Sequence, residues 1–141
     1  MTGFEDLVIA ARTVYGEARG ESFEGKRAVA HVLLNRLRAG NSSSLAGVCL
    51  RPLQFSCWNR GDPNLPRLLA AGFDDRGFRD CLRAVIEACD ETDPTAGATH
   101  YLNRAAWTRM QGAPAHGPQN WAKGLQPSAE IGGHLFFNNV P

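Results

Sequence analysis

The chain contains 141 residues, of which 43% are hydrophobic and 21% charged, the balance of an ordinary globular protein. Its 15 Lys and Arg residues against 14 Asp and Glu residues give a net charge of +1, which argues against a nucleic-acid partner held by a strong positive field. The length predicts a single domain over residues 1–141, with a core large enough to need no metal or disulfide.

The start of the chain carries no sign of export or membrane insertion. Residues 1–6 have neither a basic segment nor a continuous apolar segment, so we expect no secretory signal and synthesis in the cytoplasm. No apolar run approaches the roughly 18 residues that a membrane span requires. We therefore expect no stable membrane insertion.

Two amphipathic helices are predicted at the start of the chain. The first covers residues 5–19 and ends at Gly20, and its apolar face carries Leu7, Ala11, Val14 and Ala18. The second covers residues 23–38, with Ser22 as its N-cap.

The rest of the chain changes from helical to strand-like patterns. Residues 45–76 have weak periodicity and three prolines, which indicates loops with a short helix near 66–71. A helix at 78–89 has an apolar stripe of Phe78, Cys81, Leu82, Val85, Ile86 and Cys89. Short strands are predicted at 98–103 and 134–138, on either side of a Gly- and Pro-rich stretch. Helices followed by strands indicate an α+β fold that is mainly α.

The four cysteines form no CxxC pair, so the usual zinc-ribbon spacing is absent. Cys81 and Cys89 lie eight positions apart in one predicted helix, roughly 12 Å, which is too far for a disulfide between them. Pairing of either with Cys49 or Cys57 stays open. The favoured interpretation is four free, buried thiols that act as small apolar residues.

Glu17 is the most informative polar residue. It lies at the edge of the first helix's apolar face, in the last turn before Gly20. A carboxyl group there is partly removed from water, which favours its protonated form and suits general acid catalysis. The alternative is an ordinary boundary carboxylate paired with Arg19 or Arg36.

Several segments together resemble the SleB/CwlJ-type cell wall hydrolases, a family that includes spore cortex-lytic enzymes. They are residues 15–21 (YGEARGE), 25–36 (GKRAVAHVLLNR), 54–56 (QFS), 93–103 (DPTAGATHYLN), 121–122 (WA) and 131–137 (IGGHLFF). These segments occur in the family's order and extend over nearly the whole chain.

The resemblance implies a lysozyme-like fold related to lytic transglycosylases and an enzyme that cleaves peptidoglycan glycan strands. In that family the glutamate of the YGEA segment is the catalytic acid, which corresponds to Glu17. Cleavage between N-acetylmuramic acid and N-acetylglucosamine often leaves a 1,6-anhydro end. That chemistry needs one carboxyl group, whereas a hydrolytic muramidase more usually needs two.

The remaining candidate residues fit a sugar-binding site. Substrate contacts are expected from Gln54, Phe55, Ser56, Tyr101, Asn103 and Trp121. Tyr101 can support the oxocarbenium-like transition state or position Glu17, and Asn103 is expected on the same strand face. Structural or supporting roles are expected for Glu21, Asn35 and His134, with Asn35 and Arg36 joining the second helix to the loop that carries Glu21.

A second carboxylate has three candidates and no clear choice. They are Glu21, beyond the first helix, Asp62, in a loop, and Glu130, before the last strand. Each is more often a surface charge or a structural group than a catalyst, and the absence of an obvious partner favours the transglycosylase.

Three other classes of protein are alternatives to this interpretation. A metal-dependent hydrolase would draw on His31, His100, His116 and His134, but no pair has a usual ligand spacing. A non-catalytic glycan-binding module would use the three Trp residues. A cysteine peptidase would need Cys57 as a thiolate with a histidine nearby.

The sequence therefore predicts a monomeric glycosidase with no cofactor, acting on peptidoglycan with Glu17 as general acid and base. Without an export signal, the chain resembles a phage-type endolysin that acts in the periplasm or cell wall once the inner membrane is breached. The alternative is a cell-encoded wall-remodelling enzyme, or a hydrolytic muramidase with a second carboxylate.

Overall fold

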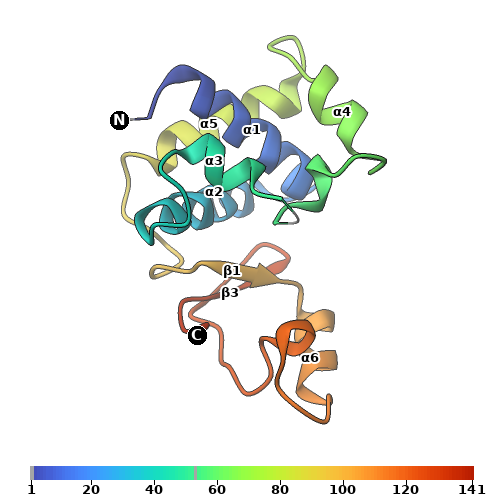
Figure 1. Cartoon of the computed structure of the whole chain (residues 1–141). Coiled ribbons are helices and arrows are strands. Elements are labelled where there is room, and N and C mark those ends of the chain that lie inside the picture. The colour runs from blue at the N-terminus through green and yellow to red at the C-terminus, as the bar shows by residue number, and fades with distance from the viewer. Residues whose placement is uncertain (1, 53) are drawn as a thin grey trace.

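The computed structural model describes residues 2–52 and 54–141, and the elements fall into two stacked parts (Figure 1). One part contains the helices α1 to α5. The other contains a small sheet with α6 beside it. The chain passes from the first part to the second after α5, so the order of helices before strands follows the prediction.

Helices α1 (Phe4–Ala18) and α2 (Phe23–Arg38) lie close to the predicted ranges. Ala10, Ala11, Val14 and Ala18 of α1 face the core. The hydroxyl of Ser22 accepts a hydrogen bond from the Gly25 N–H, which confirms its expected role as the N-cap of α2.

Helix α5 (Arg76–Ala88) packs against both α1 and α2 and completes the helical core. The carboxylate of Asp75 accepts from the Phe78 N–H and begins the helix two residues before the predicted start. The predicted stripe is wrong at its end, because Ile86 is 49% exposed and Cys89 is also exposed. The turn of α5 that carries Ala84, Val85 and Ala88 faces the core instead.

The middle section contains more helix than predicted. The short helix expected near 66–71 is α4 (Leu65–Ala70), and η1 (Ser56–Trp58) is a 3-10 turn. Helix α3 (Leu45–Leu50) was expected to be loop. It forms because Ser44 caps its first turn, and because the carboxylate of Asp6 on α1 accepts from the Ala46 N–H at 2.8 Å.

The sheet is antiparallel, with strand order β1-β3-β2. Strands β1 (His100–Leu102) and β3 (His134–Phe137) fall within the two predicted strands, and Tyr101 is paired with Phe136. Strand β2 (Ala129–Ile131), α6 (Arg104–Gln111) and the 3-10 turn η2 (Pro118–Asn120) were not predicted.

The two faces of the sheet contact different apolar clusters. Tyr101 and Phe136 pack with the main core that α1, α2 and α5 supply. The other face carries Leu135 and Phe137, which pack with a smaller cluster on the α6 side: Leu102, Trp107, Met110, Trp121, Ala122, Leu125 and Val140. Side chains that face the helices therefore alternate with side chains that face α6. In the part of the chain that the structure describes, no helix is long and apolar enough to cross a membrane.

Candidate active site

Glu17 and Tyr101 meet where the helices contact the sheet. Glu17 is half-buried in the last turn of α1, as its position on the helical stripe predicts. The Tyr101 hydroxyl on β1 donates to Oε1 of Glu17 at 2.8 Å. Burial raises the pKa of Tyr101 well above its usual value, and the charge of Glu17 and this hydrogen bond raise it further. Tyr101 is therefore a neutral donor aimed at the candidate acid.

Neither predicted partner of Glu17 as an ordinary surface carboxylate is bonded to it. The guanidinium of Arg19 donates to Asn64 Oδ1 at 3.1 Å. Arg36 is buried, and its Nε donates to the Thr99 carbonyl oxygen at 2.7 Å. Burial lowers the pKa of Arg36, while the nearby Tyr101 and Glu17 oppose that shift. Arg36 is thus a buried cation within electrostatic reach of Glu17.

Gln54 and Phe55 contact Arg36, and Ser56 follows them in the chain. The exposed Gln54 receives a hydrogen bond from Arg36 Nη1 at 3.4 Å. Phe55 is buried, with the Arg36 guanidinium 5.0 Å from its ring centroid. Its side chain therefore supports Arg36 from the core and has little surface to offer a sugar. Ser56 is exposed at the start of η1, a turn that packs on α1.

Glu21 contacts the turn between β2 and β3. Its Oε1 accepts from the Gly133 N–H at 2.7 Å and lies 3.8 Å from Nδ1 of His134. The His134 ring packs edge-on against Tyr101, with centroids 5.0 Å apart. Glu21 and His134 are therefore neighbours of the Glu17–Tyr101 pair.

Asn35 joins α2 to a different loop from the one predicted. Its Nδ2 donates to Asp93 Oδ2 at 2.7 Å and to the Ala98 carbonyl oxygen at 2.9 Å. The expected connection to the loop of Glu21 is wrong for Asn35 and for Arg36. Both residues instead anchor residues 93–99, the segment that leads into β1 and so places Tyr101.

Two predicted sugar contacts do not lie beside Tyr101. Strand β1 ends at Leu102, and the Asn103 side chain accepts from the Ala106 N–H at 2.8 Å as the N-cap of α6. Trp121 packs at 5.2 Å on Phe137 and at 5.0 Å on His100, on the α6 side of the sheet. Asn103 leaves the face of Tyr101 because β1 is short and α6 follows at once, and Trp121 belongs to the cluster on the opposite face of the sheet.

The three candidate second carboxylates are each engaged elsewhere. Glu21 is bound to Gly133, as described above. Asp62 Oδ1 accepts from the Asn64 N–H at 2.8 Å, and Glu130 pairs with Arg104 at 2.7 Å.

The cysteines are all free, and Cys49, Cys57 and Cys81 are buried as expected. The expectation is wrong for Cys89, which is exposed. Burial raises the pKa of Cys57 to about 12, and the charge of Glu17 adds to that shift. Such a thiol is neutral near pH 7, so it lacks the thiolate that a cysteine peptidase needs.

The histidines are dispersed over the molecule. His31 is buried, not solvated, and its Nε2 lies 2.9 Å from Glu91 Oε1. His100 contacts Thr99 and Trp121, and His116 contacts the Trp121 carbonyl oxygen. Among the described residues, no three His, Cys, Asp or Glu side chains converge as a metal-binding group.

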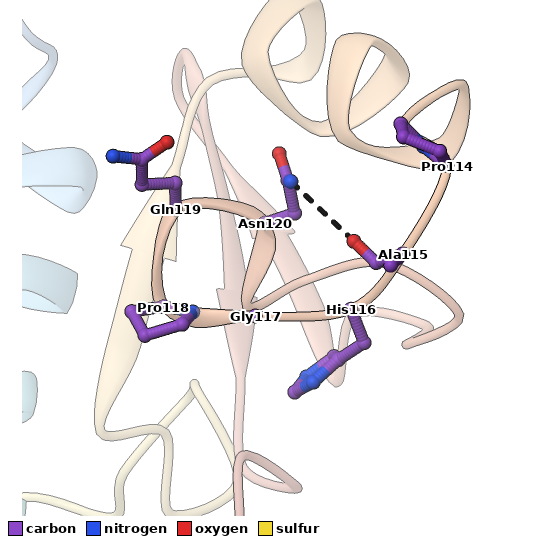
Figure 2. Close-up of a pocket in the computed structure, with 7 residues that line it drawn as sticks. All are labelled: Pro114, Ala115, His116, Gly117, Pro118, Gln119 and Asn120. Atoms are coloured by element: carbon purple, nitrogen blue, oxygen red, sulfur yellow. Dashed lines mark hydrogen bonds between the residues drawn. The ribbon is translucent and has the colours of Figure 1, made fainter.

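A hollow of about 380 Å³ lies in the loop after α6 and is lined by residues 114–120. Figure 2 shows the loop folded back on itself, with the Asn120 amide directed at the Ala115 carbonyl oxygen. None of the residues that surround Glu17 lines it.

Comparison with known proteins places the chain in a family. Residues 20–137 match the family model described as cell wall hydrolase. The chain belongs to the cell wall hydrolase family. The match begins three positions after Glu17 and includes Tyr101, Glu21 and the turn at 132–133.

The chain is also similar to parts of longer curated proteins. The chain is 34% identical over 134 residues to the spore cortex-lytic enzyme of Halalkalibacterium halodurans, covering 94% of this chain. It is 32% identical over 136 residues to the spore cortex-lytic enzyme of Bacillus subtilis, covering 93% of this chain. The chain spans 34% and 37% of the length of these two relatives.

Solved structures confirm the predicted fold. The catalytic domain of the Bacillus cereus SleB protein matches with a TM-score of 0.71 and 26% identity, covering 97% of this chain and 92% of that domain. The catalytic domain of the germination-specific lytic transglycosylase SleB from Bacillus anthracis gives 0.69 and 27%, covering 96% and 95%. The α+β, mainly helical, lysozyme-like prediction is thereby confirmed.

Proposed function

We propose that this chain cleaves peptidoglycan glycan strands between N-acetylmuramic acid and N-acetylglucosamine, as a lytic transglycosylase with Glu17 as its acid and base. The observation that carries the proposal is the hydrogen bond from Tyr101 to a half-buried Glu17 at the helix–sheet junction. Membership of the family supports the substrate, and the printed name of the Bacillus anthracis relative supports the reaction.

The first step breaks the glycosidic bond. Protonated Glu17 gives its proton to the glycosidic oxygen as the bond to C1 of the muramyl residue breaks, and the sugar on the other side leaves with a free hydroxyl group. Positive charge develops at C1 and the ring oxygen. Tyr101 holds Oε1 of Glu17, so we assign the proton transfer to Oε2.

The second step closes the product. The muramyl 6-hydroxyl oxygen forms a bond to C1, and its proton goes to the Glu17 carboxylate, which regenerates the acid. The product carries a 1,6-anhydro end, and no water is consumed. The carboxylate of Glu17 that the first step leaves behind is the form that accepts this proton.

The surroundings of the other carboxylates favour one-carboxyl chemistry. An inverting or retaining hydrolase uses two carboxyl groups on either side of the scissile bond. Here Glu21 is bound to Gly133, Asp62 to the Asn64 N–H and Glu130 to Arg104. Releasing Glu21 for catalysis would break its contact with the turn between β2 and β3.

Two exposed polar residues beside the acid are the proposed sugar contacts. Gln54 lies against Arg36, and Ser56 begins the turn that packs on α1 near Glu17. Amide and hydroxyl groups suit the N-acetyl and hydroxyl groups of the sugars. We do not extend the proposal to Asn103 or Trp121, which lie away from the face of Tyr101.

The variant Glu17→Gln tests the acid directly, because the amide keeps the shape of the side chain and cannot transfer the proton. We expect cleavage of purified peptidoglycan to fall by about a hundredfold or more. Glu5→Gln, at the exposed start of the same helix, is the matched control and should cleave like the wild type. Equal rates for Glu17→Gln and the wild type would overturn the proposal.

A role in host-cell lysis stays a prediction with its own test. Protein added to cells whose outer membrane has been permeabilised should lower their turbidity. Intact turbidity, with full cleavage of purified peptidoglycan, would favour a wall-remodelling enzyme.

A further inference from the structure

Glu21 lies between the start of α2 and the turn that joins β2 to β3. Its backbone N–H donates to the Ala18 carbonyl oxygen at 2.9 Å, where α1 ends. Its Oε1 accepts from the Gly133 N–H at 2.7 Å, a contact between residues 112 positions apart. One residue thus connects the end of the catalytic helix, through its backbone, to the turn of the sheet, through its side chain.

The turn leaves room for this carboxylate because it consists of two glycines. A Cβ on Gly132 would lie 2.7 Å from Oε1 of Glu21, and one on Gly133 would lie 3.1 Å from Oε2. Gly132 also has a φ of +60°, a conformation that other residues rarely adopt. On its other side, a Cβ on Gly25 of α2 would lie 3.3 Å from Oε1 of Glu21. The carboxylate is closely enclosed by backbone on both sides.

His134 lies between Glu21 and Tyr101 and is close to both. Its Nδ1 is buried, has no hydrogen-bond partner among the described residues, and lies 3.8 Å from Oε1 of Glu21. Its ring meets the Tyr101 ring at an interplanar angle of 72°, an edge-to-face packing. The Tyr101 hydroxyl then donates to Glu17.

We propose that Glu21 is a positioning residue, which holds the turn at 132–133 and His134 in place so that Tyr101 keeps its hydrogen bond to Glu17. The inference rests on the proposed function of Glu17. Glu21 transfers no proton. Its carboxylate acts by accepting the hydrogen bond from the Gly133 N–H.

Three variants separate positioning from a general loss of structure. Glu21→Ala removes the acceptor, Glu21→Gln keeps an oxygen for the Gly133 N–H, and Glu130→Gln changes an exposed carboxylate of the neighbouring strand as the control. With soluble glycan strands as substrate, Glu21→Ala should lower kcat by about tenfold or more and leave KM within about twofold. Glu21→Gln should recover most of kcat, and Glu130→Gln should match the wild type.

The ionisation of Tyr101 gives a second measurement that needs no activity. The chain has two tyrosines, so Tyr15→Phe leaves Tyr101 as the only phenol. Its absorbance near 295 nm is read after a rapid jump to alkaline pH, before the chain unfolds. In the Tyr15→Phe background, Glu21→Ala should let Tyr101 ionise at a lower pH than Glu21→Gln does, because its contact with Glu17 has loosened.

The inference is overturned if Glu21→Ala leaves both kcat and the ionisation of Tyr101 unchanged. It is also overturned if activity falls only in proportion to the unfolded fraction in thermal melts, or if Glu21→Gln fails as badly as Glu21→Ala. Failure of the proposed function is distinguishable, since a wild type without cleavage leaves the tyrosine measurement to decide the role of Glu21.

Discussion

The hydroxyl of Tyr101 and the carboxylate of Glu17 are 2.8 Å apart, although 84 positions separate the two residues in the chain. This contact joins β1 to the last turn of α1 and places the candidate acid at the boundary between the helices and the sheet. A buried phenol remains neutral near pH 7 and can only donate to a carboxylate. The contact therefore orients Glu17.

Removing that hydroxyl should weaken catalysis more than folding. We expect Tyr101→Phe to lower kcat by about tenfold to a hundredfold, since the ring still packs on His134 but the acid is no longer held. The free energy of unfolding should fall by only about 1 kcal/mol for one lost hydrogen bond. Tyr15→Phe removes a similar bond to Asp75 and serves as the control. A Tyr101→Phe enzyme with the kcat of the wild type would contradict the orienting role.

Gly16 is expected to be intolerant of any side chain. A Cβ there would lie 2.7 Å from the Cβ of Cys57 and 3.1 Å from Leu68. Gly16→Ala should reduce the free energy of unfolding by about 1–3 kcal/mol, because η1 must move away from α1. Urea unfolding measures the loss. At Gly20 a Cβ would meet nothing within 4 Å, so Gly20→Ala should be near neutral, and equal effects at both positions would contradict the close packing.

Asp93 should make folding sensitive to acid. Burial alone raises its pKa, but hydrogen bonds from Thr95, Asn35 and Gly97 outweigh burial and hold the pKa below its usual value. The folded chain therefore binds this proton less readily than the unfolded chain, so the stability that Asp93 contributes is present at neutral pH and is lost as the pH falls below about 4.

The variant Asp93→Asn measures that contribution. At pH 7 it should be less stable than the wild type by about 1–3 kcal/mol, because an amide cannot accept from all of these donors. Below about pH 4 the difference should narrow as the wild-type carboxylate takes up its proton. Urea midpoints over pH 2–7 provide the comparison, and a constant difference across that range would count against the assignment.

The thiols should react in two separate groups. Burial raises the pKa of all four thiols, to about 12 for Cys49, Cys57 and Cys81, and of the four only Cys89 is exposed to solvent. A thiol reagent at pH 8 should therefore modify Cys89 quickly and the other three only after unfolding. Cleavage should survive modification of Cys89. Rapid modification of Cys57 with loss of activity would revive the cysteine-peptidase alternative.

The sequence patterns predicted the helices that bury a continuous stripe of apolar side chains. Helices α1, α2 and α5 each place apolar residues against one another at helical spacing, so periodicity reveals them. Glu17 was found for the same reason, because the edge of such a stripe is visible in the sequence. Positioning Glu17 was one of the two roles predicted for Tyr101. The sequence could not show that the two side chains are in contact, because that depends on how the sheet packs against α1.

The missed elements lack that signal. Helix α6 contains no buried residue among those described, so it has no buried apolar stripe for the sequence to reveal. Strand β2 has only three residues, with the exposed Glu130 at its centre, which is too short to show an alternating pattern. Helix α3 depends on Asp6 from another helix. The N-caps Ser44 and Asn103 were the available clues. Reading Asn103 as a cap, not as a strand residue, would also have removed it from the predicted sugar site.

Mass spectrometry of muropeptides released by the wild type tests the central claim most directly. Peptidoglycan digested by the wild type should yield fragments whose muramyl ends are lighter by one water than reducing ends, and Glu17→Gln should release none. That result would establish a transglycosylase in which one carboxyl group acts as acid and base. Reducing ends, or anhydro ends formed equally well by Glu17→Gln, would contradict it.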